Sequence, residues 1–233
     1  MTRDELHIAF KIEMDKNSKT VAYGGCPAFL DEEIDYWLMK GYYQVIATKF
    51  TGNNNLKIPF EGSVKRISDL ERLVNTDKNI SVQKEENSNC IILSNLLSRD
   101  GSNQGRMFFV QAELIWNNGE DHRAIVELTD HNIINNFKQT YNNVPWIERP
   151  KAVIQDNSLI IYIDPIDMTG DFTLDLTYVK FPTPITELPS EEGLTEVPEY
   201  VQSEIVDKAV QLALDNIESQ RIQTKSQLNL ISE

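Results

Sequence analysis

The chain has 233 residues, 40% of them hydrophobic and 25% charged, which is typical of a globular protein with one large or two small domains. Its formal net charge of −14 argues against a general grip on nucleic acid, because binding phosphates needs a basic face. We expect no signal peptide or membrane span, since charges interrupt the start and no apolar run approaches the roughly 20 residues that cross a bilayer. Cys26 and Cys90 stand in unrelated contexts, which indicates a reducing compartment without disulfides.

Residues 2–15 leave two interpretations open. Alternate residues from Leu6 to Met14 are apolar, as in a strand, but part of the same set also fits one face of a helix. Thr2 and Glu5 have the spacing of a capping box. The cap favours a helix.

Residues 31–52 predict a long helix around which the rest of the chain is organised. Asp31 is expected to cap its start, and Gly52 fits a left-handed cap at its end. Gly41 lies on the buried face, where it is either a tolerated weakness or the point at which another helix approaches closely. The residues of that face recur at steps of three and four: Ile34, Trp37, Leu38, Gly41, Tyr42, Val45 and Phe50.

Two further helices are predicted. Residues 63–75 carry an apolar stripe that runs from Val64 through Ile67 and Leu70 to Val74. Residues 198–220 have a broad apolar face, which we expect to pack on the helix of residues 31–52.

The segment between these helices is rich in β-branched and aromatic residues, with turn residues at short intervals. Asn118-Gly119 and Asp156-Asn157 are expected to form hairpin turns, and residues 172–181 alternate cleanly as a strand. Five or more such strands predict a small antiparallel β-sandwich or partly open barrel.

The predicted fold class is therefore α+β: a helical layer or bundle with an inserted β domain and an extended C-terminal arm. The helical domain comprises residues 1–78 and 187–220, the β-rich domain comprises residues 79–186, and the arm comprises residues 221–233.

No constellation of catalytic or metal-binding residues stands out. The three histidines, His7, His122 and His131, lack metal-ligand spacing and are expected on the surface. The aspartates at positions 164, 167, 171 and 175 fit an acidic turn better than a calcium site. Motifs for phosphate binding or an activated serine are absent, so we expect no cofactor and no metal.

The helix of residues 63–75 also carries a small basic face, formed by Lys65, Arg66 and Arg72. It is either a solvated face balanced by Asp69 and Glu71 or a contact for an acidic neighbour or for DNA phosphates.

Several stretches carry a resemblance when they are taken together. PAFLDEEIDYWLMKGYYQVIATKFTG and VKRISDLERLV precede a β region that ends in LTYVKFPTPI, and a Pro- and Glu-rich linker then leads to PEYVQSEIVDKAVQLAL and QRIQTKSQ. In this order they resemble the head-to-tail connector (neck, collar or adaptor ring) proteins of short-tailed bacteriophages, most closely those of crAss-like phages. The resemblance covers most of the chain, although residues 79–150 match only in type, and it involves structural positions rather than catalytic ones.

The resemblance implies a structural virion protein, not an enzyme, that is made in the bacterial cytoplasm. It implies a homo-oligomeric ring, commonly of twelve copies, that contacts the portal and other neck or tail proteins. Double-stranded DNA passes through such a ring without specific binding, and no membrane is involved. The predicted interface residues are Arg66, Arg72, Arg221, Ile222, Leu228, Leu230 and Ile231.

Two alternatives remain. In the first, the β domain is a ligand-binding module for carbohydrate or protein with Trp116, Tyr141, Trp146 and Tyr162 as an aromatic platform, although burial in the core is the favoured use of these residues. Alternatively, the chain is a hydrolase with a carboxylate pair among its 36 acidic residues.

Overall fold

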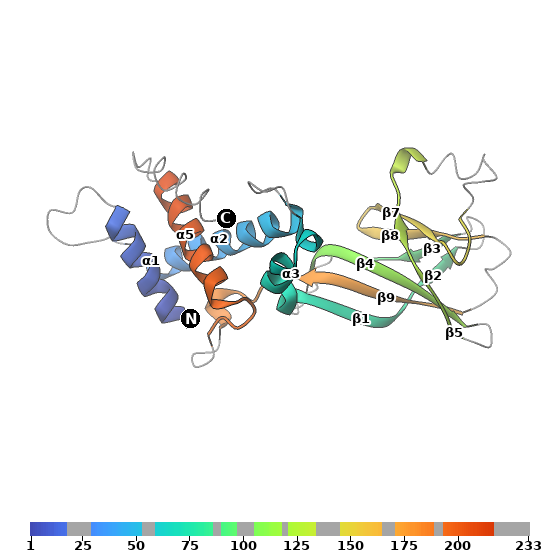
Figure 1. The fold of residues 1–233 in the computed structure, drawn as a ribbon, viewed down its shortest axis with the longest axis horizontal. Coiled ribbons are helices and arrows are strands. Elements are labelled where there is room, and N and C mark those ends of the chain that lie inside the picture. Colours follow the sequence, from blue (N-terminus) through green and yellow to red (C-terminus); the bar gives the residue numbers. More distant parts are fainter. Residues whose placement is uncertain are drawn as a thin grey trace. The chain divides into compact units, whose positions relative to one another are not determined.

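The computed structural model describes residues 1–17, 29–52, 59–85, 90–96, 105–117, 121–133, 145–164, 171–188 and 193–216. The chain forms two compact units (Figure 1). The helical unit comprises Met1–Leu73 and Pro182–Glu233, and the β unit comprises Val74–Phe181. Helices and strands are both abundant, so the predicted α+β class is confirmed. The unit boundaries lie five residues before the expected boundaries at positions 79 and 187.

The helical unit is built on three long helices: α1 (Arg3–Asn17), α2 (Asp31–Thr51) and α5 (Glu199–Asn216). Of the two interpretations of residues 2–15, the helix is correct. The short α3 (Val64–Leu70) lies between the 3₁₀ turns η1 (Phe60–Gly62) and η2 (Glu71–Leu73), and a further turn, η5 (Ile185–Glu187), precedes α5.

One apolar cluster joins the three long helices. Leu6, Phe10 and Met14 of α1 meet Ile34 and Leu38 of α2, and α5 contributes a row from Val206 to Leu214. The expected packing of α5 on α2 is confirmed.

The ends of α2 differ in how well they were predicted. Gly52 has the expected left-handed conformation, with φ of 71°, and its N–H donates to the Thr48 carbonyl. Asp31, however, is the first helical residue and not the cap. Leu30 precedes the helix, and its N–H donates to the Glu33 side chain at 2.9 Å. The N–H groups of Glu33 and Ile34, which an Asp31 cap would have bound, donate instead to the Leu30 carbonyl.

The prediction for residues 63–75 is partly wrong. The α-helix ends at Leu70, and Val74 already begins a strand. The expected faces are only partly correct: Leu70 and Leu73 are buried as expected, but Val64 and Ile67 are exposed, whereas Arg66 and Asp69 are buried. The physical reason is tertiary, because Asp69 binds Lys49 of α2 and turns this side of α3 inward.

The β unit contains two sheets. The first has the order β1-β9-β4-β5, from strands Val74–Ser81, Asp171–Lys180, Arg106–Asn117 and Asp121–Ile125. The second has the order β2-β3-β8-β7-β6, from Gln83–Glu85, Cys90–Leu93, Ser158–Tyr162, Lys151–Gln155 and Glu127–Leu128. Residues of both sheets share one core, which includes Leu114, Trp116, Leu159, Ile161 and Leu174.

The expected hairpin at Asp156-Asn157 is present between β7 and β8, with both turn residues at positive φ. The strands that flank Asn118-Gly119 pair as expected, while the turn itself lies outside the described residues. One expectation is wrong: the sheets are not purely antiparallel, because β6 pairs with β7 in parallel. The chain changes sheet at Val126, whose N–H still donates to Ala112 of the first sheet.

Candidate functional site

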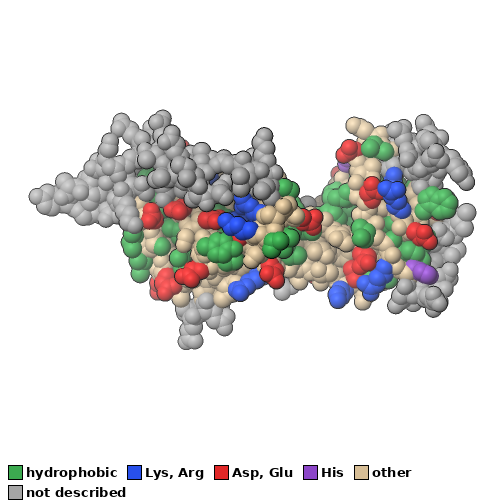
Figure 2. Space-filling view, in the orientation of Figure 1, with side chains coloured by type: hydrophobic (Ala, Val, Ile, Leu, Met, Phe, Trp, Pro, Cys, Tyr) green, Lys and Arg blue, Asp and Glu red, His purple; other side chains and the backbone are tan. Residues whose placement is uncertain are grey.

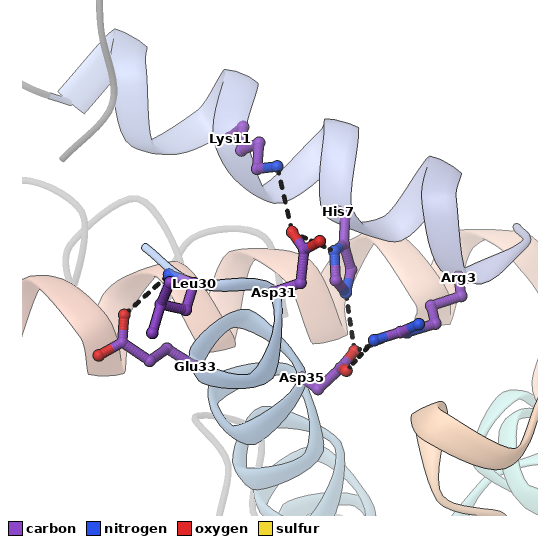
Figure 3. A network of polar contacts seen from close by, with 7 residues as sticks. All are labelled: Arg3, His7, Lys11, Leu30, Asp31, Glu33 and Asp35. Carbon is purple, nitrogen blue, oxygen red and sulfur yellow. Dashed lines mark hydrogen bonds and ion pairs between the residues drawn. The ribbon is translucent and has the colours of Figure 1, made fainter. Parts of the chain in front are cut away.

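A network of charged side chains joins the start of α2 to α1 (Figure 3). Asp35 accepts hydrogen bonds from Arg3, at 3.2 and 2.5 Å, and its Oδ1 lies 2.7 Å from His7 Nε2. Asp31 lies 3.5 Å from both the His7 Nδ1 and the Lys11 Nζ. Asp35 is buried and Asp31 is exposed, so Asp35 contributes more than Asp31 to the contact between α1 and α2.

The environment of Asp35 shifts its acidity. Burial alone raises the pKa of this carboxyl, but hydrogen bonds from Arg3 and His7 outweigh burial and hold the pKa below its ordinary value of 3.8. The carboxylate is therefore ionised at neutral pH and binds both Arg3 and His7. The prediction that His7 lies on the surface is wrong, because only 7% of the surface of this residue is exposed. His122 and His131 are exposed, as expected.

A second charged cluster lies at the other end of α2. Lys49 Nζ contacts Asp69 of α3 at 2.9 Å and Glu204 of α5 at 2.6 Å. Tyr200 of α5 donates to the other Asp69 oxygen at 2.5 Å. Lys49 and Asp69 are both buried, so this cluster fixes α3 against α2 and α5.

The β unit has its own polar cluster on β1, β4 and β9. Arg106 donates to Asp77 at 2.8 Å and lies over the ring of Tyr178, whose hydroxyl donates to the same carboxylate at 3.1 Å. Burial and Asp77 raise the pKa of Tyr178. These groups bind one another, so the cluster connects strands and offers no activated nucleophile or base.

Chemistry beyond these contacts has little support in the described part of the chain. No group of three or more candidate ligands among the described residues has the geometry to hold a metal ion. Asp175, one of the four aspartates of the acidic stretch, is buried and accepts from the Asn79 N–H at 2.7 Å, while Asp167 lies outside the described residues. No helix of the described residues has the length and apolar character to cross a membrane.

Exposed apolar side chains are the more informative feature of the helical unit. Ile8 and Ile12 of α1 are 57% and 49% exposed, and together with Asp4 they form a row at four-residue steps that we call the α1 face. Val64 and Ile67 of α3 are 84% and 42% exposed, and we call this pair the α3 face. Apolar periodicity in the sequence did not single out Ile8 and Ile12, and it predicted Val64 and Ile67 in the core. Figure 2 shows acidic side chains spread over the visible surface around apolar ones.

The predicted interface residues have different outcomes. Arg66 is buried, so its assignment to an exposed basic face is wrong. Arg72 is exposed, and its Nη1 donates to the Thr195 carbonyl at 2.7 Å. Arg221, Ile222, Leu228, Leu230 and Ile231 lie outside the described residues.

The proposed aromatic platform does not form as one surface. Trp116 belongs to the core of the β unit, whereas Trp146 is 58% exposed. Tyr162 is half-buried, and Tyr141 lies outside the described residues. The comparisons with protein-family models and with curated proteins yield no match to this chain.

Proposed function

We propose that the chain is a structural virion protein that forms a ring between the portal and the tail of a short-tailed bacteriophage. In this role it lines part of the channel for the phage DNA and contacts the portal and other neck or tail proteins. The proposal begins from the resemblance of the sequence to connector proteins.

The observation that carries the proposal is the exposure of paired apolar side chains on helices of an otherwise acidic unit. Single exposed apolar residues are common, but β-branched residues paired at helical spacing on two helices favour contact with protein. The charge of −14 favours a channel wall that does not retain DNA.

A ligand-binding β module remains the second candidate, and it has weaker support. Trp146 is the exposed member of the proposed platform, but the burial of Trp116 removes a stacking surface. Binding of sugars by the β unit alone would favour this candidate.

Native mass spectrometry of the chain, alone and mixed with the portal protein of the same virus, tests the ring. We expect a closed ring, of twelve copies by the resemblance, either in solution or on the portal. Monomers that do not bind the portal would contradict the proposal.

Binding to duplex DNA provides a second measurement. An acidic channel wall predicts weak binding that is seen only at low salt. Tight binding that persists at high salt would instead indicate a DNA-binding protein.

A further inference from the structure

The α1 face and the α3 face lie at opposite ends of α2. His7 and Lys11 of α1 contact Asp31 in the first turn of α2, whereas Asp69 of α3 binds Lys49 in its last turn. A helix of 21 residues is about 30 Å long at 1.5 Å per residue. Figure 1 shows α1 and α3 at the two ends of α2 within the helical unit. The unit therefore has two separate apolar faces.

The α3 helix buries two charged residues and exposes two apolar ones. Arg66 and Asp69 are buried beside Leu70, while Val64 and Ile67 point to solvent. Burying Asp69 is tolerated because Lys49 and Tyr200 bind both of its oxygens. The contacts that stabilise the unit thus keep an apolar pair exposed, which is expected if another molecule covers the pair.

The charges beside the two faces differ. Among the described residues, the exposed charged ones around the α1 face and the adjoining first turn of α2 are Asp4, Glu5, Lys11, Asp31, Glu32 and Glu33, with a net charge of −4. The exposed charged residues of η1, α3 and η2 are Glu61, Lys65, Glu71 and Arg72, with a net charge of zero. Contact between two α1 faces would therefore bring like charges together, whereas contact between an α1 face and an α3 face would not.

We propose that the α1 face of one copy of this chain binds the α3 face of the next copy, in a head-to-tail contact. Because the two contacting surfaces differ, the contact is heterologous and repeats from copy to copy until the rotation closes a ring. This inference deepens the proposed function and rests on the ring that it includes, because it names the surfaces through which the ring forms.

Two double variants separate a head-to-tail contact from a symmetric one. The first, Ile8→Asp with Ile12→Asp, removes the α1 face and keeps the α3 face. The second, Val64→Asp with Ile67→Asp, does the opposite. Ile8→Leu with Ile12→Leu is the matched control, since it keeps the α1 face apolar. Oligomer mass is measured by sedimentation at the highest soluble concentration and by native mass spectrometry.

Each aspartate variant alone is expected to be monomeric at concentrations at which the wild type assembles, because the contact would bury an unpaired charge. The protein concentration at which half of it is assembled is expected to rise by about tenfold or more. An equal mixture of the two is expected to form a 1:1 dimer and nothing larger, since one intact pair of faces remains. The leucine control is expected to assemble like the wild type. Serine replaces aspartate at the same positions if thermal melting shows that an aspartate variant is unfolded.

Three results would overturn the inference. They are a mixture that stays monomeric under conditions in which the wild type assembles, an aspartate variant that assembles like the wild type, and a wild type that self-associates neither alone nor on the portal. The proposed function is decided separately by the portal experiment. If both aspartate variants still form rings on the portal, the connector role is supported, and the proposed contact between the α1 face and the α3 face is wrong.

Discussion

Gly41 of α2 lies directly against the backbone of Ala209 in α5. A β-carbon on Gly41 would come within 2.8 Å of the Ala209 nitrogen and 2.9 Å of the Ile205 carbonyl oxygen. The sequence left open whether this glycine is a weakness or a point of close approach, and the structure supports close approach. The two helices meet here with no room for a side chain.

Gly41→Ala is expected to lower the free energy of unfolding by about 1–3 kcal/mol, despite the better helix propensity of alanine, because the helices must separate. Urea denaturation measures the change. Adding Ala209→Gly is expected to give no rescue, since the close atoms belong to the backbone at positions 205 and 209. Recovery of stability in that double variant would show that the side chain of Ala209 is the obstacle.

Asp35→Asn is expected to cost about 2 kcal/mol near neutral pH, because the buried side chain loses its charged hydrogen bonds to Arg3 and His7. The matched control is Asp31→Asn, which changes an exposed partner of the same histidine at 3.5 Å and is expected to cost at most about 0.5 kcal/mol. Equal losses in the two variants would contradict the unequal roles of these carboxylates.

The contribution of Asp35 also depends on pH. Its pKa in the folded protein lies below the ordinary value of 3.8, so its stabilising effect is complete above that pH and is lost as the pH falls through the folded pKa. The difference in unfolding free energy between the wild type and Asp35→Asn is therefore expected to shrink below about pH 4. Denaturation at a series of acidic pH values measures this difference. A difference that grows on acidification would contradict the lowered pKa of Asp35 in the folded protein.

The accuracy of the sequence-based predictions follows the length of the pattern. The helix of α2 was predicted because its apolar residues repeat over 21 positions, which leaves one consistent face. In α3, seven residues make only two turns, and Val64 and Ile67 then resemble core positions although both are exposed. The pairing of Lys49 with Asp69, which sets the true orientation, joins residues of different helices and leaves no local signal.

The same reasoning applies to the candidate surfaces. Ile8 and Ile12 fitted the strand interpretation, and the helix interpretation placed only Leu6, Ala9, Phe10 and Met14 on its apolar face. The apolar residues left off that face were the signal for an exposed α1 face. Burial of His7 depends on Asp35, which lies 28 positions away in the sequence, so periodicity could not reveal it.

The C-terminal arm gives a prediction about assembly. Ala213 and Leu214 are the last buried residues that the structure describes in α5, and the arm follows this packed helix in the sequence. Deleting residues 222–233 is therefore expected to leave the melting temperature of the isolated subunit nearly unchanged. It is expected to block stable incorporation into particles, because Ile222, Leu228, Leu230 and Ile231 are too few to fold alone and need a neighbour to cover them. Normal yields of infectious particles from the truncated chain would show that the arm is dispensable.

The buried pair of Lys49 and Asp69 is expected to control where α3 points. Lys49→Met leaves the Asp69 carboxylate buried beside Tyr200 without its cation, which should cost about 3–5 kcal/mol in urea denaturation. The control is Lys40→Met on the same helix, an exposed lysine whose loss is expected to cost less than about 1 kcal/mol. Lys49→Met with Asp69→Leu removes the buried carboxylate together with its cation and should recover much of the loss, since Glu204, which also loses Lys49, is partly exposed. With the pair removed, α3 is free to turn Val64 and Ile67 inward, which would remove the exposed α3 face. The double variant should therefore be stable but assemble poorly. Full assembly by the double variant would show that Lys49 and Asp69 stabilise the unit without orienting the α3 face.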